Sequence, residues 1–156
     1  MVPDSYDPSV YDGLSSIADA VKKFDAVDGE SLVSDSFREL FLQHNMDRTF
    51  GLALLHRHFD LSTDERLVEY HGTSIPWRQE TASSHIRPTN WLLTKDGSVR
   101  SYEFYYPSSH DDGVDAEAGD PKYRPFIRAF EALLLQKNVM DLFGLCRYPV
   151  TTSRVA

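Results

Sequence analysis

The chain has 156 residues, of which 41% are hydrophobic and 26% are charged, and its formal net charge is −8. This length and composition are typical of one folded domain with its own hydrophobic core, and they exclude a wholly disordered chain. The negative charge argues against nucleic acid and anionic lipid as partners, because phosphates require a basic protein surface.

The N-terminus and the cysteine content favour an intracellular protein. Residues 1–7 contain neither the basic cluster nor the apolar core of a secretory signal, and no later segment has about 18 uninterrupted apolar residues. Cys146 is the only cysteine, so an internal disulfide is impossible. We therefore expect a cytoplasmic location and no association with a membrane.

Two helices are predicted before the first strand. Asp7-Pro8 is a helix-start signal, and apolar residues follow it at helical spacing as far as Phe24, which predicts one amphipathic helix. Residues 36–39 match a capping box, which predicts a short second helix that ends at Asn45.

Four segments in the middle of the chain have the composition and pattern of β-strands. They are Phe50–Phe59, Arg66–Gly72, Thr89–Thr94 and Val99–Tyr106. The first two are predicted to form an antiparallel hairpin across a polar loop. The last two form a second hairpin, in which Asp96-Gly97 favours a type I′ turn. In that register Trp91 faces Tyr102 on one apolar face of the sheet.

One long helix and a last strand complete the predicted fold. Asp120-Pro121 starts the helix, and its apolar residues recur every three or four positions until Asn138. The strand covers residues 142–148, and its Phe-Gly-Leu repeats that of the first strand, so we expect the two strands to be neighbours.

The order of these elements predicts an α+β protein. Its sheet is expected to be mostly antiparallel, with about five strands, and to carry the N-terminal helices and the long C-terminal helix on one face. Residues 1–30 would form an N-terminal extension with an amphipathic helix, residues 31–150 a single α+β domain, and residues 151–156 a loose tail.

The candidate chemistry centres on two histidines at the end of the first predicted strand. On a strand, His56 and His58 point to the same face because side chains alternate. If the first hairpin is centred near residues 62–63, Glu69 and His71 join that face. His56 or His58 would then act as the acid or base, and Glu69 would orient the imidazole.

The sequence leaves three functional hypotheses open. The alternative without a function is that one imidazole packs in the core with its nitrogen hydrogen-bonded, while the other lies at the strand end. The preferred hypothesis is a protein that binds a small organic molecule and catalyses an isomerase, cyclase or lyase reaction without a cofactor. In the second, His56, His58 and His71 hold a divalent transition metal for a metal-dependent enzyme. The third is a non-catalytic interaction module whose sheet edge or N-terminal amphipathic helix docks on a protein partner, or which forms a homodimer.

Five further residues are candidates for contact with a substrate. Arg57 and Arg87 could fix an anionic group, and His85 lies on a loop that could close over a pocket. Trp91 and Tyr102 belong to a group of aromatic residues that could line an apolar pocket. Loop polarity and core packing would explain the same residues without a substrate.

The strand with the two histidines resembles a segment of small uncharacterised fungal proteins, which have a Gly-x-x-Leu-x-His-x-His strand. In this sequence the match consists of His56, His58, the run Tyr102-Glu103-Phe104 and the run Gly144 to Tyr148. The resemblance covers residues 35–150. It implies a fungal source and carries no activity with it.

Overall fold

The fold is built around a single six-stranded sheet. The computed structural model describes residues 6–70, 72–78, 86–107 and 116–148. The strands are β1 (Phe50–Leu54), β2 (Glu65–Tyr70), β3 (Thr73–Arg78), β4 (Arg87–Leu93), β5 (Val99–Tyr105) and β6 (Phe143–Arg147). They lie in the order β1-β6-β4-β5-β2-β3. All neighbouring described strands are antiparallel except β2 and β5, which are parallel.

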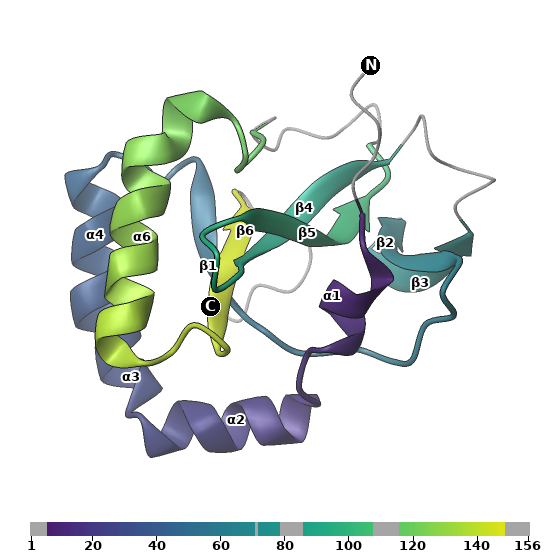
Figure 1. The fold of residues 1–156 in the computed structure, drawn as a ribbon, viewed down its shortest axis with the longest axis horizontal. Coiled ribbons are helices and arrows are strands. Elements are labelled where there is room, and N and C mark those ends of the chain that lie inside the picture. Colours follow the sequence, from purple (N-terminus) through teal and green to yellow (C-terminus); the bar gives the residue numbers. More distant parts are fainter. Residues whose placement is uncertain (1–5, 71, 79–85, 108–115, 149–156) are drawn as a thin grey trace.

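Helices lie before the sheet and between its last two strands in the sequence. They are α1 (Pro8–Asp12), α2 (Ile17–Ala26), α3 (Gly29–Ser31), η1 (Leu32–Phe37), α4 (Arg38–Gln43), η2 (Pro121–Tyr123) and α6 (Arg124–Lys137). Figure 1 shows α4 and α6 side by side at one end of the molecule, with α2 running below the sheet. The protein is therefore α+β with a mostly antiparallel sheet and a long C-terminal helix, as the sequence predicts.

The predicted N-terminal helix is in fact two helices. Asp7 caps α1 as expected, because its side chain accepts a hydrogen bond from the Ser9 N–H at 3.0 Å. The helix then stops at Gly13, and the Ser16 side chain caps α2 by accepting from the Asp19 N–H at 3.2 Å. Serine side chains compete for backbone hydrogen bonds, so the cap at Ser16 interrupts a helical spacing that otherwise looks continuous.

The second helical run starts earlier than the predicted capping box at residues 36–39. The chain is already helical from Gly29, and α3, η1 and α4 follow one another without a break. Asp28 has φ 53°, which separates this run from α2, and Asn45 has φ 56° beyond its end. Phe37, within the supposed box, is fully buried against α6. Tertiary packing of this apolar face therefore overrides the local capping signal.

The predicted hairpin between residues 50–59 and 66–72 is wrong. β1 ends at Leu54 and pairs with β6, with Leu52 opposite Leu145, so the two Phe-Gly-Leu strands are neighbours as expected. β2 pairs instead with β3 and β5. The partner strand β3 contains Pro76 and is not among the strands that the sequence predicts, because proline is disfavoured within a strand. As the outer strand of the sheet, β3 can accommodate this proline.

The predicted hairpin of β4 and β5 is confirmed, but its turn and register differ. Gly97 has φ 83° while Asp96 does not have a positive φ, and the Gly97 N–H donates to the Thr94 carbonyl at 2.9 Å. This pattern is a type I turn followed by a left-handed glycine, not a type I′ turn. Trp91 pairs with Ser101 rather than Tyr102.

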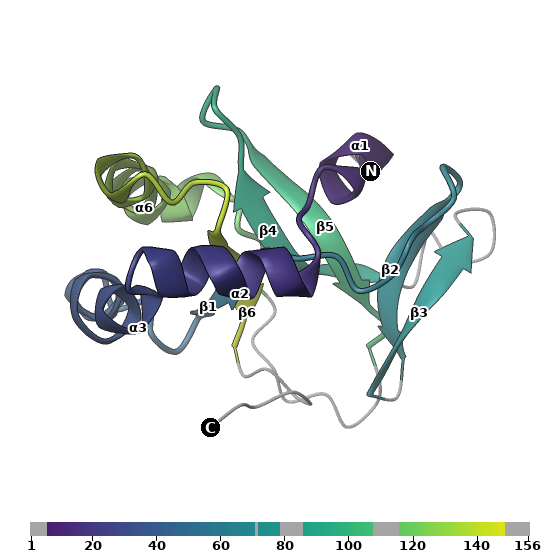
Figure 2. The same cartoon turned by 90° about the horizontal axis from the view of Figure 1, so that it is seen from below.

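Two hydrophobic cores lie on opposite sides of the β4–β5 hairpin. Figure 2 shows α6 on one side of these strands and α1 on the other. The larger core includes Phe37, Phe41, Phe50, Trp91, Phe126, Phe130, Leu134, Phe143 and Leu145. The smaller core contains Tyr11, Leu14, Leu55, Leu67 and Tyr102. Trp91 and Tyr102 therefore belong to different cores and do not share a face.

Candidate functional site

Both histidines lie in the segment from Leu55 to Phe59. This segment is not a strand but a connection that is hydrogen-bonded to the sheet and to the N-terminal residues around α1. The Leu55 N–H donates to the Leu142 carbonyl at 2.8 Å, and the Leu55 side chain is buried in the smaller core. Two residues on, the Arg57 N–H donates to the Ser15 carbonyl at 2.8 Å. These bonds fix the backbone on both sides of His56.

A buried tyrosine hydroxyl fixes the backbone around His58. The Tyr11 hydroxyl donates to the Phe59 carbonyl at 2.8 Å and accepts from the N–H groups of His58 at 3.0 Å and Phe59 at 3.3 Å. Tyr11 is fully buried, and this burial raises the pKa of its hydroxyl. The hydroxyl therefore stays protonated near neutral pH and can hold all three contacts.

His58 forms an ion pair with a carboxylate from β5. Its Nε2 lies 3.4 Å from Oε2 of Glu103, and the two side chains are 33% and 13% exposed. The hydrogen bond that His58 donates to Glu103 raises the pKa of His58 above its ordinary value, and burial of the ring opposes this in part. The imidazole thus remains partly exposed to solvent while the carboxylate stabilises its charged form.

His56 is oriented by its own backbone and lies against His58. Its Nδ1 is 2.8 Å from the Leu54 carbonyl oxygen, which can only accept, so Nδ1 carries the proton. In a neutral ring this leaves the lone pair on Nε2. The centroids of the two imidazoles are 4.9 Å apart and their planes are inclined by 32°. We call His56, His58, Glu103 and Tyr11 the His58 cluster.

Glu103 joins this cluster from an irregular stretch of the β4–β5 pairing. Trp91 pairs with Ser101, whereas the preceding Asn90 pairs with Glu103, so Tyr102 is an extra residue in β5. Thr89 is an extra residue in β4 on the other side of Asn90, and the register is restored beyond it. Tyr102 packs with Tyr11 in the smaller core, and Glu103 contacts His58. Two successive residues thus contact the same region, which regular strand alternation would not allow.

The extra residue Tyr102 is part of the polar surroundings but is closed to solvent. Its hydroxyl accepts a hydrogen bond from the Asn90 amide at 3.4 Å. Tyr102 is fully buried, and burial raises the pKa of its hydroxyl well above the ordinary value. Tyr102 therefore supports the cluster from within the core.

The carboxylate predicted to orient the histidine was Glu69, and the structure does not place it opposite His56. Glu69 lies on β2, where it pairs with Ser74 of β3 and Tyr105 of β5. The carboxylate beside His58 is Glu103, which sequence reasoning missed because the Tyr-Glu-Phe run was interpreted as part of an apolar strand. The feature that could have identified Glu103 is its position as a single acidic residue between two aromatic residues of a strand.

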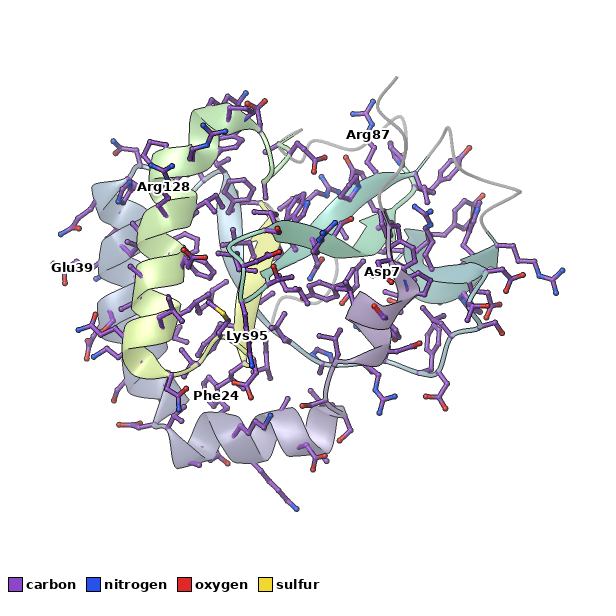
Figure 3. All side chains as sticks on the ribbon, in the orientation of Figure 1. Asp7, Phe24, Glu39, Arg87, Lys95 and Arg128 are labelled. Carbon is purple, nitrogen blue, oxygen red and sulfur yellow. The ribbon has the colours of Figure 1, made fainter. Side chains whose placement is uncertain are left out.

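The other predicted contact residues are dispersed. Arg57 lies 3.5 Å from Asp60 in an exposed pair. Arg87 begins β4, and Figure 3 shows its side chain at the outer margin of the molecule, pointing outwards. Trp91 is buried in the larger core, where its Nε1 donates to Glu117 at 3.2 Å. His85 lies outside the described residues.

The metal hypothesis required His56, His58 and His71. Across the described ranges no three His, Cys, Asp or Glu side chains come together as a metal site requires, and His71 lies outside those ranges. Cys146 is buried in β6, and burial raises the pKa of its thiol to about 11. The thiol is therefore protonated at neutral pH, as expected for a small buried hydrophobic residue rather than a nucleophile.

Comparisons with protein-family models, with curated proteins and with solved structures found no match for this chain. In the part of the chain that the structure describes, no helix combines the length and the apolar character needed to cross a membrane.

Proposed function

We propose that the protein binds a small organic molecule at the partly exposed side chain of His58 and moves a proton on it, as an isomerase, cyclase or lyase does. The observation that carries the proposal is the 3.4 Å contact between His58 Nε2 and Glu103 Oε2. A carboxylate that accepts from one imidazole nitrogen leaves the other nitrogen as the base and stabilises the imidazolium that forms.

Each member of the His58 cluster has a distinct part in this proposal. Neutral His58 carries its proton on Nε2, beside Glu103, and takes a proton from the substrate on Nδ1. His56 offers a second lone pair on Nε2 and can exchange a proton at another substrate atom. Tyr11 holds the backbone of His58 in place and is a positioning residue. The reaction proposed uses no cofactor.

The proposal includes a cytoplasmic location. It is supported by the single cysteine, which needs no oxidising compartment. The proposed partner is a small organic molecule that presents an acidic C–H or O–H group, because imidazole acts as acid and base near neutral pH.

Deuterium exchange tests the proposal even though the substrate is unidentified. A panel of small ketones, aldehydes and β-hydroxy acids is incubated with the protein in D2O, and NMR follows the loss of C–H signals. We expect accelerated exchange of at least one compound, lowered about 100-fold or more in His58→Gln, the usual size of general acid–base catalysis.

A matched histidine provides the control for this assay. His44 lies at the C-cap of α4, and His44→Gln should exchange at the wild-type rate. Circular dichroism of both variants verifies that they are folded. Exchange no faster than in buffer across the panel, or wild-type exchange in His58→Gln, would contradict the proposed function.

A second candidate function is a non-catalytic interaction module, favoured by the surface of α2. Ile17 and Val21 lie one helical turn apart and are both exposed large hydrophobic residues. Such a stripe is typical of a helix that docks on a protein partner. If this is the function, Ile17→Glu with Val21→Glu abolishes partner binding, and deuterium exchange is absent in wild type and variant alike.

A further inference from the structure

The two outer strands of the sheet differ in how they are protected against pairing with another chain. β3 carries Pro76 and Arg78, which are residues that proteins place on outer strands to prevent such pairing. β1 reads Phe-Gly-Leu-Ala-Leu and contains no proline and no charge. Figure 1 shows β1 at the end of the sheet beside α4. Its free edge therefore has the composition of a pairing site.

The hydrogen bonds to β6 determine which groups of β1 point to the free edge. Thr49 accepts from the Tyr148 N–H, and the Leu55 N–H donates to Leu142. In an antiparallel pair, alternate residues make these bonds and the residues between them point the other way. The N–H and C=O groups of Phe50, Leu52 and Leu54 are therefore directed outwards.

Two of these six outward groups are already occupied. The Phe50 N–H donates to the Met46 carbonyl at 2.9 Å, and the Leu54 carbonyl accepts from His56 Nδ1 at 2.8 Å. No bond from another described segment reaches the remaining four groups, which are the Phe50 C=O, the Leu52 N–H and C=O, and the Leu54 N–H.

This set of four groups is self-complementary. When a second β1 is placed antiparallel about a two-fold axis at Leu52, each Leu52 N–H meets the Leu52 C=O of the other copy. Each Leu54 N–H likewise meets the Phe50 C=O of the other copy. All four groups of each copy are then satisfied, and the two occupied groups lie just outside the paired region.

An apolar groove runs along this edge. It has a volume of about 570 Å³ and lies between the η1–α4 run and β1. Its apolar lining includes Val33, Phe41, Leu42 and Leu52. Val33 and Leu42 are 38% and 45% exposed, so the apolar lining of the groove is open to solvent. A strand added to β1 would bring apolar side chains over them.

The charges in the groove also favour a second copy over a foreign peptide. Arg38 and Asp47 both line it, and neither forms an ion pair with another described residue. A surface with one cation and one anion can complement its own copy, because a two-fold axis can bring each cation towards the anion of the other copy. A peptide selected by charge would instead require one sign to dominate.

We infer that β1 is a homodimer interface, in which two copies pair antiparallel about Leu52 and extend one sheet through both. The bond from His56 to Leu54 marks one end of this interface, so the dimer forms next to the His58 cluster. The dimer interface does not depend on the proposed function, because it is argued from the backbone groups of β1, from the apolar groove and from the charges of Arg38 and Asp47.

Sedimentation equilibrium of the full chain over 1 μM to 1 mM tests the interface. We expect a dimer whose dissociation constant rises at least tenfold in Leu42→Lys, which charges an exposed groove position without opening the core. Leu135→Lys is the matched control, since Leu135 is 61% exposed on α6 and outside the groove, and it should dimerise as wild type does.

Charge reversal gives a second, independent arm. Arg38→Glu and Asp47→Arg should each weaken the dimer, and the double variant should restore it because opposite charges again face each other. Amide hydrogen exchange should slow with concentration at Leu52 and Leu54 and not in β3. A monomer at 1 mM, a dimer insensitive to Leu42→Lys, or protection confined to β3 would overturn the inference.

Discussion

The two cores on either side of the β4–β5 hairpin differ in what they contribute. The larger core, beneath α4 and α6, is built from aliphatic and aromatic side chains, with Phe37 and Phe130 at 5.7 Å between ring centroids. The smaller core includes the fully buried Tyr11 and Tyr102 and adjoins the ion pair of His58. Apolar packing on one face thus supplies stability, while the other face holds a titratable side chain in a fixed orientation.

The largest effect is expected from truncation in the larger core. Phe130 is fully buried, so Phe130→Ala should lower the free energy of unfolding by about 3–5 kcal/mol, through lost burial and the cavity left behind. Urea denaturation measures this change. If the two cores act independently, the pKa of His58 in the folded Phe130→Ala variant equals its wild-type value. A changed pKa would show that the larger core influences His58.

Removing one hydroxyl should produce a smaller effect, located in the second core. Tyr11→Phe deprives three partly buried backbone groups of their partner, which should cost about 0.5–1.5 kcal/mol and slow proton exchange by loosening His58. Tyr102→Phe is the matched control, since its hydroxyl has one long contact at 3.4 Å and should cost less. Equal losses in the two variants would argue against a special role for Tyr11.

The pH dependence of stability should reveal the ion pair. Because Glu103 raises the pKa of His58, the stabilisation is present below the unfolded pKa of about 6.5 and is lost as pH rises through the folded pKa. Glu103→Gln should remove it, so the two proteins differ most near pH 5.5 and least near pH 8.5. The difference should be no more than about 1 kcal/mol, because a partly exposed pair is screened by solvent.

The smallest effect on the His58 cluster is expected from substitution of Glu69, the carboxylate that the sequence predicted to orient the histidine. Glu69 lies on β2 and pairs with Ser74, so Glu69→Gln should leave the NMR titration of His58 unchanged. A lowered pKa of His58 in this variant would mean that Glu69, not only Glu103, acts on the ring.

The architecture followed from the sequence where one element carries its own pattern. The α+β class and the α6 helix rest on helical periodicity, and the β4–β5 hairpin rests on its glycine turn. The neighbouring strands β1 and β6 were found from their shared Phe-Gly-Leu. In each case the information lies within a few residues.

The end of β1 and the carboxylate at the site depend on contacts between distant segments. Tyr11 and Phe59 are 48 positions apart in the sequence, and the hydrogen bond between them helps to hold the segment of His56 and His58 outside the sheet. The strand predicted for these two histidines is therefore absent. Glu103 contacts His58 from a stretch where the β4–β5 register is irregular, which no spacing in the sequence indicates. Both histidines were identified as candidates, but their partners were not.

The most direct test of the account is the titration of His58 itself. NMR of the ring signals between pH 5 and 9, in wild type and Glu103→Gln, measures its pKa in each protein. We expect a wild-type pKa above 6.5 that falls in the variant, because the carboxylate at 3.4 Å is the main cause of the shift. A wild-type pKa at or below 6.5, unchanged by Glu103→Gln, would contradict the central claim that His58 and Glu103 act as one unit.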